Sequence, residues 1–134
     1  AEAAGSTGVG AILGVGISGL VQIVRHKKTG VEYAMKTLRL GRLEDFHKTD
    51  ELRNEITVMS QLNHPNICRL LEIYESPTRD SICLILELCT GGELLSRLNK
   101  LGHYSEKRCC DLVRKMLLAV RHCHAHGLCH RDLK

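Results

Sequence analysis

The chain has 134 residues, of which 43% are apolar and 25% charged, and its 19 basic and 15 acidic residues give a formal net charge of +4. These values are typical of a globular protein, and the length fits one small domain or part of a larger one. The basic residues are scattered and form no stripe, so we expect no nucleic-acid partner.

The first third of the chain predicts strands separated by turns. We expect a disordered Ala/Gly tail over residues 1–9, strands over 11–15, 20–26 and 31–38, a turn over 27–30 and a polar linker over 41–48. A charge-free run from Ala3 to Val24 leaves a membrane span as an alternative. The many glycines in this run disfavour a helix, so we expect a glycine-punctuated strand pair and no membrane span.

A helix is predicted over residues 50–62, because Leu52 and Ile56 share one apolar face and Asp50 and Glu51 would lie in its first turn. Strands over 67–74 and 82–88 and helices over 93–101 and 105–125 complete the predicted elements. The order is five strands with one inserted helix, followed by helices. This order predicts an α+β fold with a boundary near Gly91 and a ligand site in the cleft between its two parts.

The seven cysteines lie in apolar segments, so we expect reduced thiols in a cytoplasmic protein, with the nucleus as the alternative compartment. The chain also contains a His/Cys-rich stretch that would suit zinc, over residues 122–126 with Cys129 and His130. Cys123 falls on the apolar stripe of the last predicted helix, however, and histidines suit a helix C-terminus. We therefore expect no metal site there.

Gly14, Gly16 and Gly19 form a glycine-rich turn that lets backbone N–H groups approach phosphate oxygens. The same spacing occurs in dinucleotide-binding βαβ units, but there a helix follows the glycines directly. Here the β-branched segment 20–24 follows, which favours a hairpin over the phosphates.

Three charged positions complete a phosphoryl-transfer pattern. Lys36 lies on a predicted strand, where it would reach a polyphosphate, and Glu55 on the following helix is its best anionic partner. Asp132 could accept the proton of a substrate hydroxyl, and Lys134 could neutralise charge on the transferred group. Taken singly, Lys36 and Glu55 also fit solvated surface residues, and the last residues fit a polar tail.

The motifs together resemble the eukaryotic protein kinase domain of serine/threonine type. The resemblance runs from about Ala11 to Lys134 and is carried by six segments: 13–21, 33–36, 53–56, 62–67, 86–94 and 126–134. The Glu-Leu-Cys-Thr-Gly-Gly-Glu-Leu and Asn-His-Pro-Asn-Ile segments are most similar to the calmodulin-kinase group, especially calcium-dependent protein kinases. The resemblance implies a five-stranded antiparallel N-lobe with one inserted helix over 10–90, including the hinge, and a partial helical C-lobe over 91–134.

The resemblance also implies a role for each matching residue. The loop that covers ATP would comprise Leu13, Gly14, Val15, Gly16, Ile17, Ser18, Gly19, Leu20 and Val21. Ala34 and Leu86 would complete the adenine pocket with Leu13 and Val21, and backbone groups of Glu87 and Cys89 would bind the adenine. Lys36 would hold the α- and β-phosphates and pair with Glu55. Glu93 would lie near the ribose, Arg131 would anchor an activation segment, Asp132 would be the base, and Lys134 would contact the γ-phosphate.

Two departures from the family pattern limit the expectation. Ser18 stands at the loop tip where an aromatic residue is usual. The chain is cut in the catalytic loop, so the residues that would hold Mg²⁺, and any calcium-binding regulatory domain, would follow Lys134. We therefore expect an ATP- and Mg²⁺-dependent serine/threonine kinase acting on a protein substrate, with this chain as an N-terminal fragment that is inactive alone. The alternative is a non-catalytic ATP-binding or interaction fragment, and the coding sequence after Lys134 would discriminate between the two.

Overall fold

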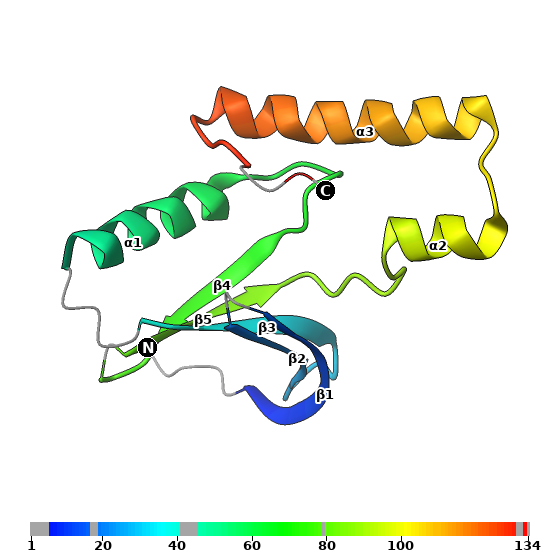
Figure 1. Cartoon of the computed structure of the whole chain (residues 1–134). Coiled ribbons are helices and arrows are strands. Elements are labelled where there is room, and N and C mark those ends of the chain that lie inside the picture. Colours follow the sequence, from blue (N-terminus) through cyan, green and yellow to red (C-terminus); the bar gives the residue numbers. More distant parts are fainter. Residues whose placement is uncertain (1–5, 17–18, 41–45, 79, 131–132, 134) are drawn as a thin grey trace.

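The computed structural model describes residues 6–16, 19–40, 46–78, 80–130 and 133 (Figure 1). These residues form, in chain order, β1 (Ser6–Gly16), β2 (Gly19–His26), β3 (Glu32–Arg39), α1 (Phe46–Gln61), β4 (Leu70–Glu75), β5 (Ser81–Leu86), α2 (Leu94–Leu101) and α3 (Glu106–Ala125). The strands make one antiparallel sheet with the order β1-β2-β3-β5-β4. The predicted five-stranded sheet with an inserted helix and following helices is confirmed.

The hydrophobic core lies between α1 and one face of the sheet. Ile56 of α1 packs with Leu40, Leu70, Ile82 and Leu84, which are all less than 10% exposed. Each buried side chain of this size contributes about 1.5–3 kcal/mol. This core fixes α1 on the sheet, and an ion pair between Arg53 of α1 and Glu75 of β4 lies beside it.

Several element boundaries differ from the prediction. Residues 6–9 are not a disordered tail, because Ser6 and Val9 pair with His26 and Val24 in the β1–β2 ladder, which contains register shifts. Pairing with β2 satisfies the backbone hydrogen bonds of this Gly-rich segment, although its residues have a weak intrinsic preference for strands. The sequence pattern missed the pairing because Gly and Ala dominate the stretch.

The linker over 41–48 was also predicted too long, since α1 begins at Phe46; residues 41–45 lie outside the described residues. Residues 46–49 are too few to show a helical apolar period, so the sequence pattern did not include them in the helix. The prediction placed Asp50 and Glu51 in the first turn of the helix. Because α1 begins earlier, both residues lie after its first turn. Strands β4 and β5 are shorter than predicted, starting at Leu70 and ending at Leu86.

The two C-terminal helices have regular ends. Gly102 ends α2 with a positive φ of 79°, and its N–H donates to the Leu98 carbonyl at 2.8 Å. Ser105 caps α3 by accepting a hydrogen bond from the Arg108 N–H at 3.4 Å. Figure 1 shows α1 and α3 on the same side of the sheet. Within the described ranges, no helix combines the length and the apolar character that a bilayer crossing requires.

Candidate functional site

The sheet register aligns three of the predicted site residues. Gly14 of β1 lies opposite Val21 of β2, and Val21 lies opposite Lys36 of β3. Residues opposite each other in an antiparallel ladder project to the same face of the sheet. The glycine turn and the lysine are therefore neighbours across three strands, although they are far apart in the sequence.

The same face carries two predicted adenine-pocket residues. Ala34 is two positions from Lys36, so it shares its face, and Ala34 lies opposite Leu86 of β5. Ala34 is 8% exposed, and Lys36 and Leu86 are half-buried. The apolar part of this sheet face, formed by Ala34 and Leu86, is therefore followed by the positively charged Lys36. Leu13 and Val15, by contrast, lie on β1 with 51% and 77% of their surface exposed.

Two glycines of the turn have different surroundings. Among the described residues, nothing lies within 4 Å of a Cβ added at Gly14, so they leave the space above this residue open. A Cβ at Gly19 would lie 2.0 Å from the Thr37 carbonyl oxygen, and Gly19 has a φ of 124°. Gly19 is thus required by the packing of β2 on β3, whereas Gly14 leaves room for a phosphate group. Gly14 and Lys36 lie in the same row of the sheet.

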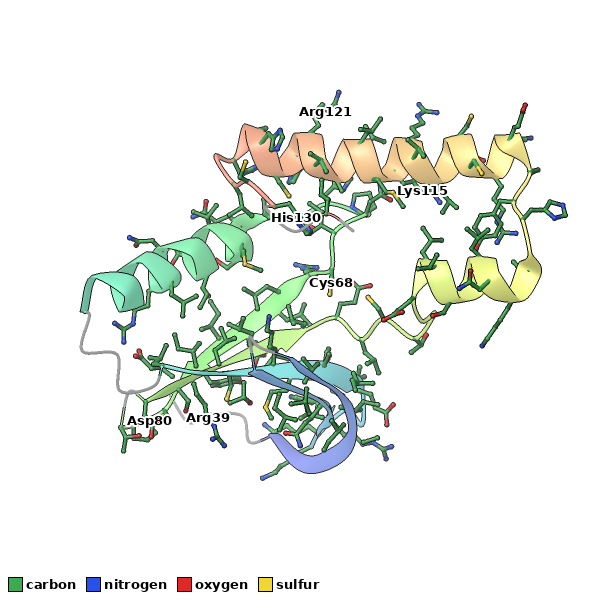
Figure 2. All side chains as sticks on the ribbon, in the orientation of Figure 1. Arg39, Cys68, Asp80, Lys115, Arg121 and His130 are labelled. Atoms are coloured by element: carbon green, nitrogen blue, oxygen red, sulfur yellow. The ribbon has the colours of Figure 1, made fainter. Side chains whose placement is uncertain are left out.

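A cavity of about 670 Å³ extends from Lys36 into the space between the sheet, α1 and α3. Its walls are mainly apolar, including Leu86 of β5, Val120 of α3 and, from the C-terminal segment, His130 and Leu133. Figure 2 shows His130 beneath α3, on the side that faces the rest of the chain. The C-terminal segment therefore shares one cavity with Lys36.

The hinge, residues 87–93 between β5 and α2, is tied to the start of β4. The Glu87 N–H donates to the Arg69 carbonyl at 2.9 Å, and the Cys68 thiol donates to the Glu87 carbonyl at 3.4 Å. A carbonyl oxygen has two lone pairs, so the Glu87 carbonyl keeps one for a ligand. Cys89 is exposed, and Glu93 accepts a hydrogen bond from the Ser96 hydroxyl at 3.2 Å, just before α2.

Several predicted site residues lie outside the described residues. These are Ile17, Ser18, Arg131, Asp132 and Lys134, together with the side chain of Glu55. Leu20, Gly16 and Glu55 have described backbones in β2, β1 and α1, respectively. The Lys36–Glu55 pair and the roles of the last residues remain predictions.

The structure brings together three histidines that the sequence analysis did not connect. The His122 ring on α3 lies 5.0 Å from that of His64, which follows α1, and 4.4 Å from that of His126. The Nε2 atom of His122 is buried without a hydrogen-bond partner in the described part of the chain. Burial, followed by the neighbouring His126 and His64, lowers the pKa of His122.

His122 and His126 of this cluster belong to the His/Cys-rich stretch for which zinc was the alternative. Among the described residues, no group of three or more His, Cys, Asp or Glu side chains is arranged to hold a metal ion. Cys123 is buried at 6% exposure, in line with a core position on α3. Elsewhere on α3, Val113, Met116 and Leu117 are between 47% and 64% exposed.

Comparison with known proteins identifies the family. The model of the protein kinase domain matches residues 8–134. The chain is 43% identical to human calcium/calmodulin-dependent protein kinase type IV over 91% of its own length and 24% of that protein. It is 41% identical to calcium-dependent protein kinase 1 of Oryza sativa subsp. japonica, again over 91% of this chain but 23% of the relative. The chain thus spans about a quarter of these relatives' length, and it belongs to the protein kinase domain family.

Proposed function

We propose that this chain is the nucleotide-binding part of a serine/threonine protein kinase, which transfers the γ-phosphoryl group of ATP to a protein hydroxyl. The observation that carries the proposal is the row formed by Gly14, Val21 and Lys36. It places an open glycine, an apolar wall and a cation on one face of the sheet, which are the features a nucleoside triphosphate requires.

In this proposal the adenine lies on the apolar part of the face. Val21 and Ala34 would contact one side of the ring, and Leu86 would close the inner end of the pocket. The free lone pair of the Glu87 carbonyl would accept a hydrogen bond from the adenine, and the Cys89 backbone would supply the second polar contact. Residues 10–90 then form the N-lobe with its hinge, and residues 91–134 begin the C-lobe.

The phosphates would extend from the adenine toward the glycine turn. The backbone at Gly14 would be accessible to phosphate oxygens, because within the described part of the chain no side chain fills the space above it. Lys36 would hold the α- and β-phosphates by charge-assisted hydrogen bonds, with Glu55 orienting its ammonium group. Mg²⁺, when bound, neutralises phosphate charge, and by family resemblance its protein ligands would follow Lys134.

The catalytic roles belong to the last residues of the chain. Asp132 would orient the substrate hydroxyl and accept its proton as the phosphoryl group is transferred, and Lys134 would contact the γ-phosphate. Glu93 would lie near the ribose and could meet a basic side chain of the protein substrate. The similarity to kinases named calcium-dependent suggests a calcium-binding regulatory region in the complete protein.

The direct test uses the longer protein that contains the remainder of the kinase domain. Lys36→Met and Asp132→Asn should each reduce peptide phosphorylation at least about a hundredfold, because one removes phosphate positioning and the other the base. Lys115→Met, on the exposed side of α3, is the matched control and should leave activity unchanged. Near-normal turnover of the Asp132 variant would exclude the assigned base.

A non-catalytic interaction role for the chain by itself is the second candidate. It is favoured by the exposed apolar side chains of Val113, Met116 and Leu117 on α3, because such a surface associates readily in water. A coding sequence that stops directly after Lys134 would support this candidate, whereas one that continues through the remaining kinase motifs would favour the enzyme. Phosphorylation by the pure chain would exclude it.

A further inference from the structure

Two cysteines lie on adjacent backbone segments at the hinge. Cys68 lies two residues before β4, and Cys89 lies three residues after β5. The hydrogen bond from the Glu87 N–H to the Arg69 carbonyl holds these segments side by side. Continued through this hydrogen bond, the β4–β5 register places Cys68 opposite Leu88, the residue before Cys89. Paired segments lie about 5 Å apart, so a residue next to the directly opposite position is close to the Cα separation of about 4.4–6.8 Å that a disulfide requires.

The Cys89 thiol is also near enough to affect the protonation of Cys68. The pKa of Cys68 is raised to about 11, first by burial of its sulfur, and then by the neighbouring Cys89 thiol and the Glu87 carboxylate. Both residues are nevertheless exposed enough for a small oxidant to reach them. Figure 2 shows Cys68 beside the chain segment that leaves β5.

We propose that Cys68 and Cys89 form a reversible disulfide across the hinge, and that this bond weakens adenine-nucleotide binding. The second half of this inference rests on the proposed nucleotide site. The Cys68 thiol donates to the Glu87 carbonyl, and Cys89 supplies the other proposed adenine contact. The disulfide would remove the hydrogen bond from the Cys68 thiol to the Glu87 carbonyl and draw the Cys89 backbone toward β4. The two proposed adenine contacts, at the backbones of Glu87 and Cys89, would therefore both shift.

A peroxide can supply the oxidation. The high pKa of Cys68 keeps its sulfur protonated near neutral pH, so Cys89 reacts first. Its thiolate attacks the peroxide oxygen; an S–O bond forms, the O–O bond breaks, and water leaves after protonation. Cys68 then loses its proton and attacks the Cys89 sulfenic sulfur, forming the S–S bond and releasing a second water molecule. The peroxide gains the two electrons that the two thiols lose.

Oxidation of Cys89 itself favours the second step. A neutral sulfenic acid no longer contributes the negative charge with which the Cys89 thiolate raises the pKa of Cys68. Burial and Glu87 still raise the pKa of Cys68, which slows the attack of its sulfur on Cys89 but does not prevent it. A thiol reductant should reverse the bond, because one of its sulfurs is exposed.

The test treats the purified chain with hydrogen peroxide, blocks the remaining thiols and digests it with trypsin without reduction. Cys68 falls in peptide 54–69 and Cys89 in peptide 80–97. The proposal predicts that these peptides are joined with the loss of two hydrogen atoms, and that dithiothreitol separates them. Cys68→Ser and Cys89→Ser should each abolish the product. Cys83→Ser is the matched control, since Cys83 shares the second peptide but lies opposite Thr37 within the sheet, and it should keep the product.

Binding of a fluorescent ATP analogue is measured on the same samples. Oxidation should weaken binding by the unmodified chain at least about fivefold and leave binding by the Cys68→Ser variant unchanged. Absence of the joined peptides, or joined peptides with unchanged affinity, would overturn the inference. Failure of the nucleotide site itself is recognised separately, because the reduced chain would then bind no analogue while the peptide product still reports on the disulfide.

Discussion

Gly19 and Gly14 belong to the same glycine turn, yet the structure predicts opposite effects of adding one methyl group. In Gly19→Ala, the new Cβ would lie 2.0 Å from the Thr37 carbonyl oxygen, at a φ of 124°. The unfavourable backbone conformation costs about 1–3 kcal/mol. Displacing the Thr37 carbonyl also weakens at least one ladder hydrogen bond, worth about 0.5–1.5 kcal/mol.

The sum for Gly19→Ala is a loss of about 1.5–4.5 kcal/mol in the free energy of unfolding. Gly14→Ala should change it by no more than about 0.5 kcal/mol, because its Cβ meets nothing within 4 Å. The chain contains no tryptophan, so urea unfolding is followed by circular dichroism. Equal unfolding free energies for the two variants would refute the structural distinction between these glycines.

The same pair of variants separates stability from ligand binding. Gly14→Ala keeps the fold but places a methyl group where the proposed phosphate approaches the backbone. Its affinity for ATP should therefore fall at least about tenfold while its unfolding curve stays close to that of the unmodified chain. An unchanged affinity would place the phosphates elsewhere.

Three further predictions concern the packing and its pH dependence. Ile82→Ala should lower the free energy of unfolding by about 2–5 kcal/mol because Ile82 is 3% exposed, whereas Ile73→Ala, on the neighbouring strand at 43% exposure, should cost less than about 1 kcal/mol; similar urea midpoints would contradict this. The lowered pKa of His122 means that the unfolded chain binds its proton more readily, so stability should fall as the pH drops below the ordinary value of 6.5. His122→Phe should weaken that fall, and urea midpoints that track pH identically in both proteins would exclude His122 as its source. Ser105→Ala should cost about 1 kcal/mol through loss of the α3 cap, measured by the same unfolding assay, and a value near zero would show that the cap is unimportant.

The fold was largely predictable because its signals are local. A β-branched run marked β2 and an alternating pattern marked β3, and Gly30 marked the turn between them, where it has a φ of 71°. The apolar spacing in α1 and α3 identified both helices. The first residues of β1 were missed because their strand structure depends on pairing with β2, a partner that single-residue preferences do not reveal.

The site was predictable by residue type but not by its surroundings. Lys36 and Gly14 were selected by motif spacing, and the register then placed them in one row. The pairing of Cys68 with Cys89, and of His64 with His122, depends on contacts between distant segments. No local pattern in the sequence encodes such contacts, so they emerge only from the folded chain.

The central claim is that Lys36 holds the phosphates of a nucleotide whose adenine lies on the apolar face beside it. The most direct measurement is a competition titration with ATP and with adenosine, using the unmodified chain and Lys36→Met. ATP affinity should fall at least about tenfold in the variant, whereas adenosine, which carries no phosphate, should bind both proteins equally. Equal loss of both ligands, or no saturable binding by the well-folded unmodified chain, would contradict the claim.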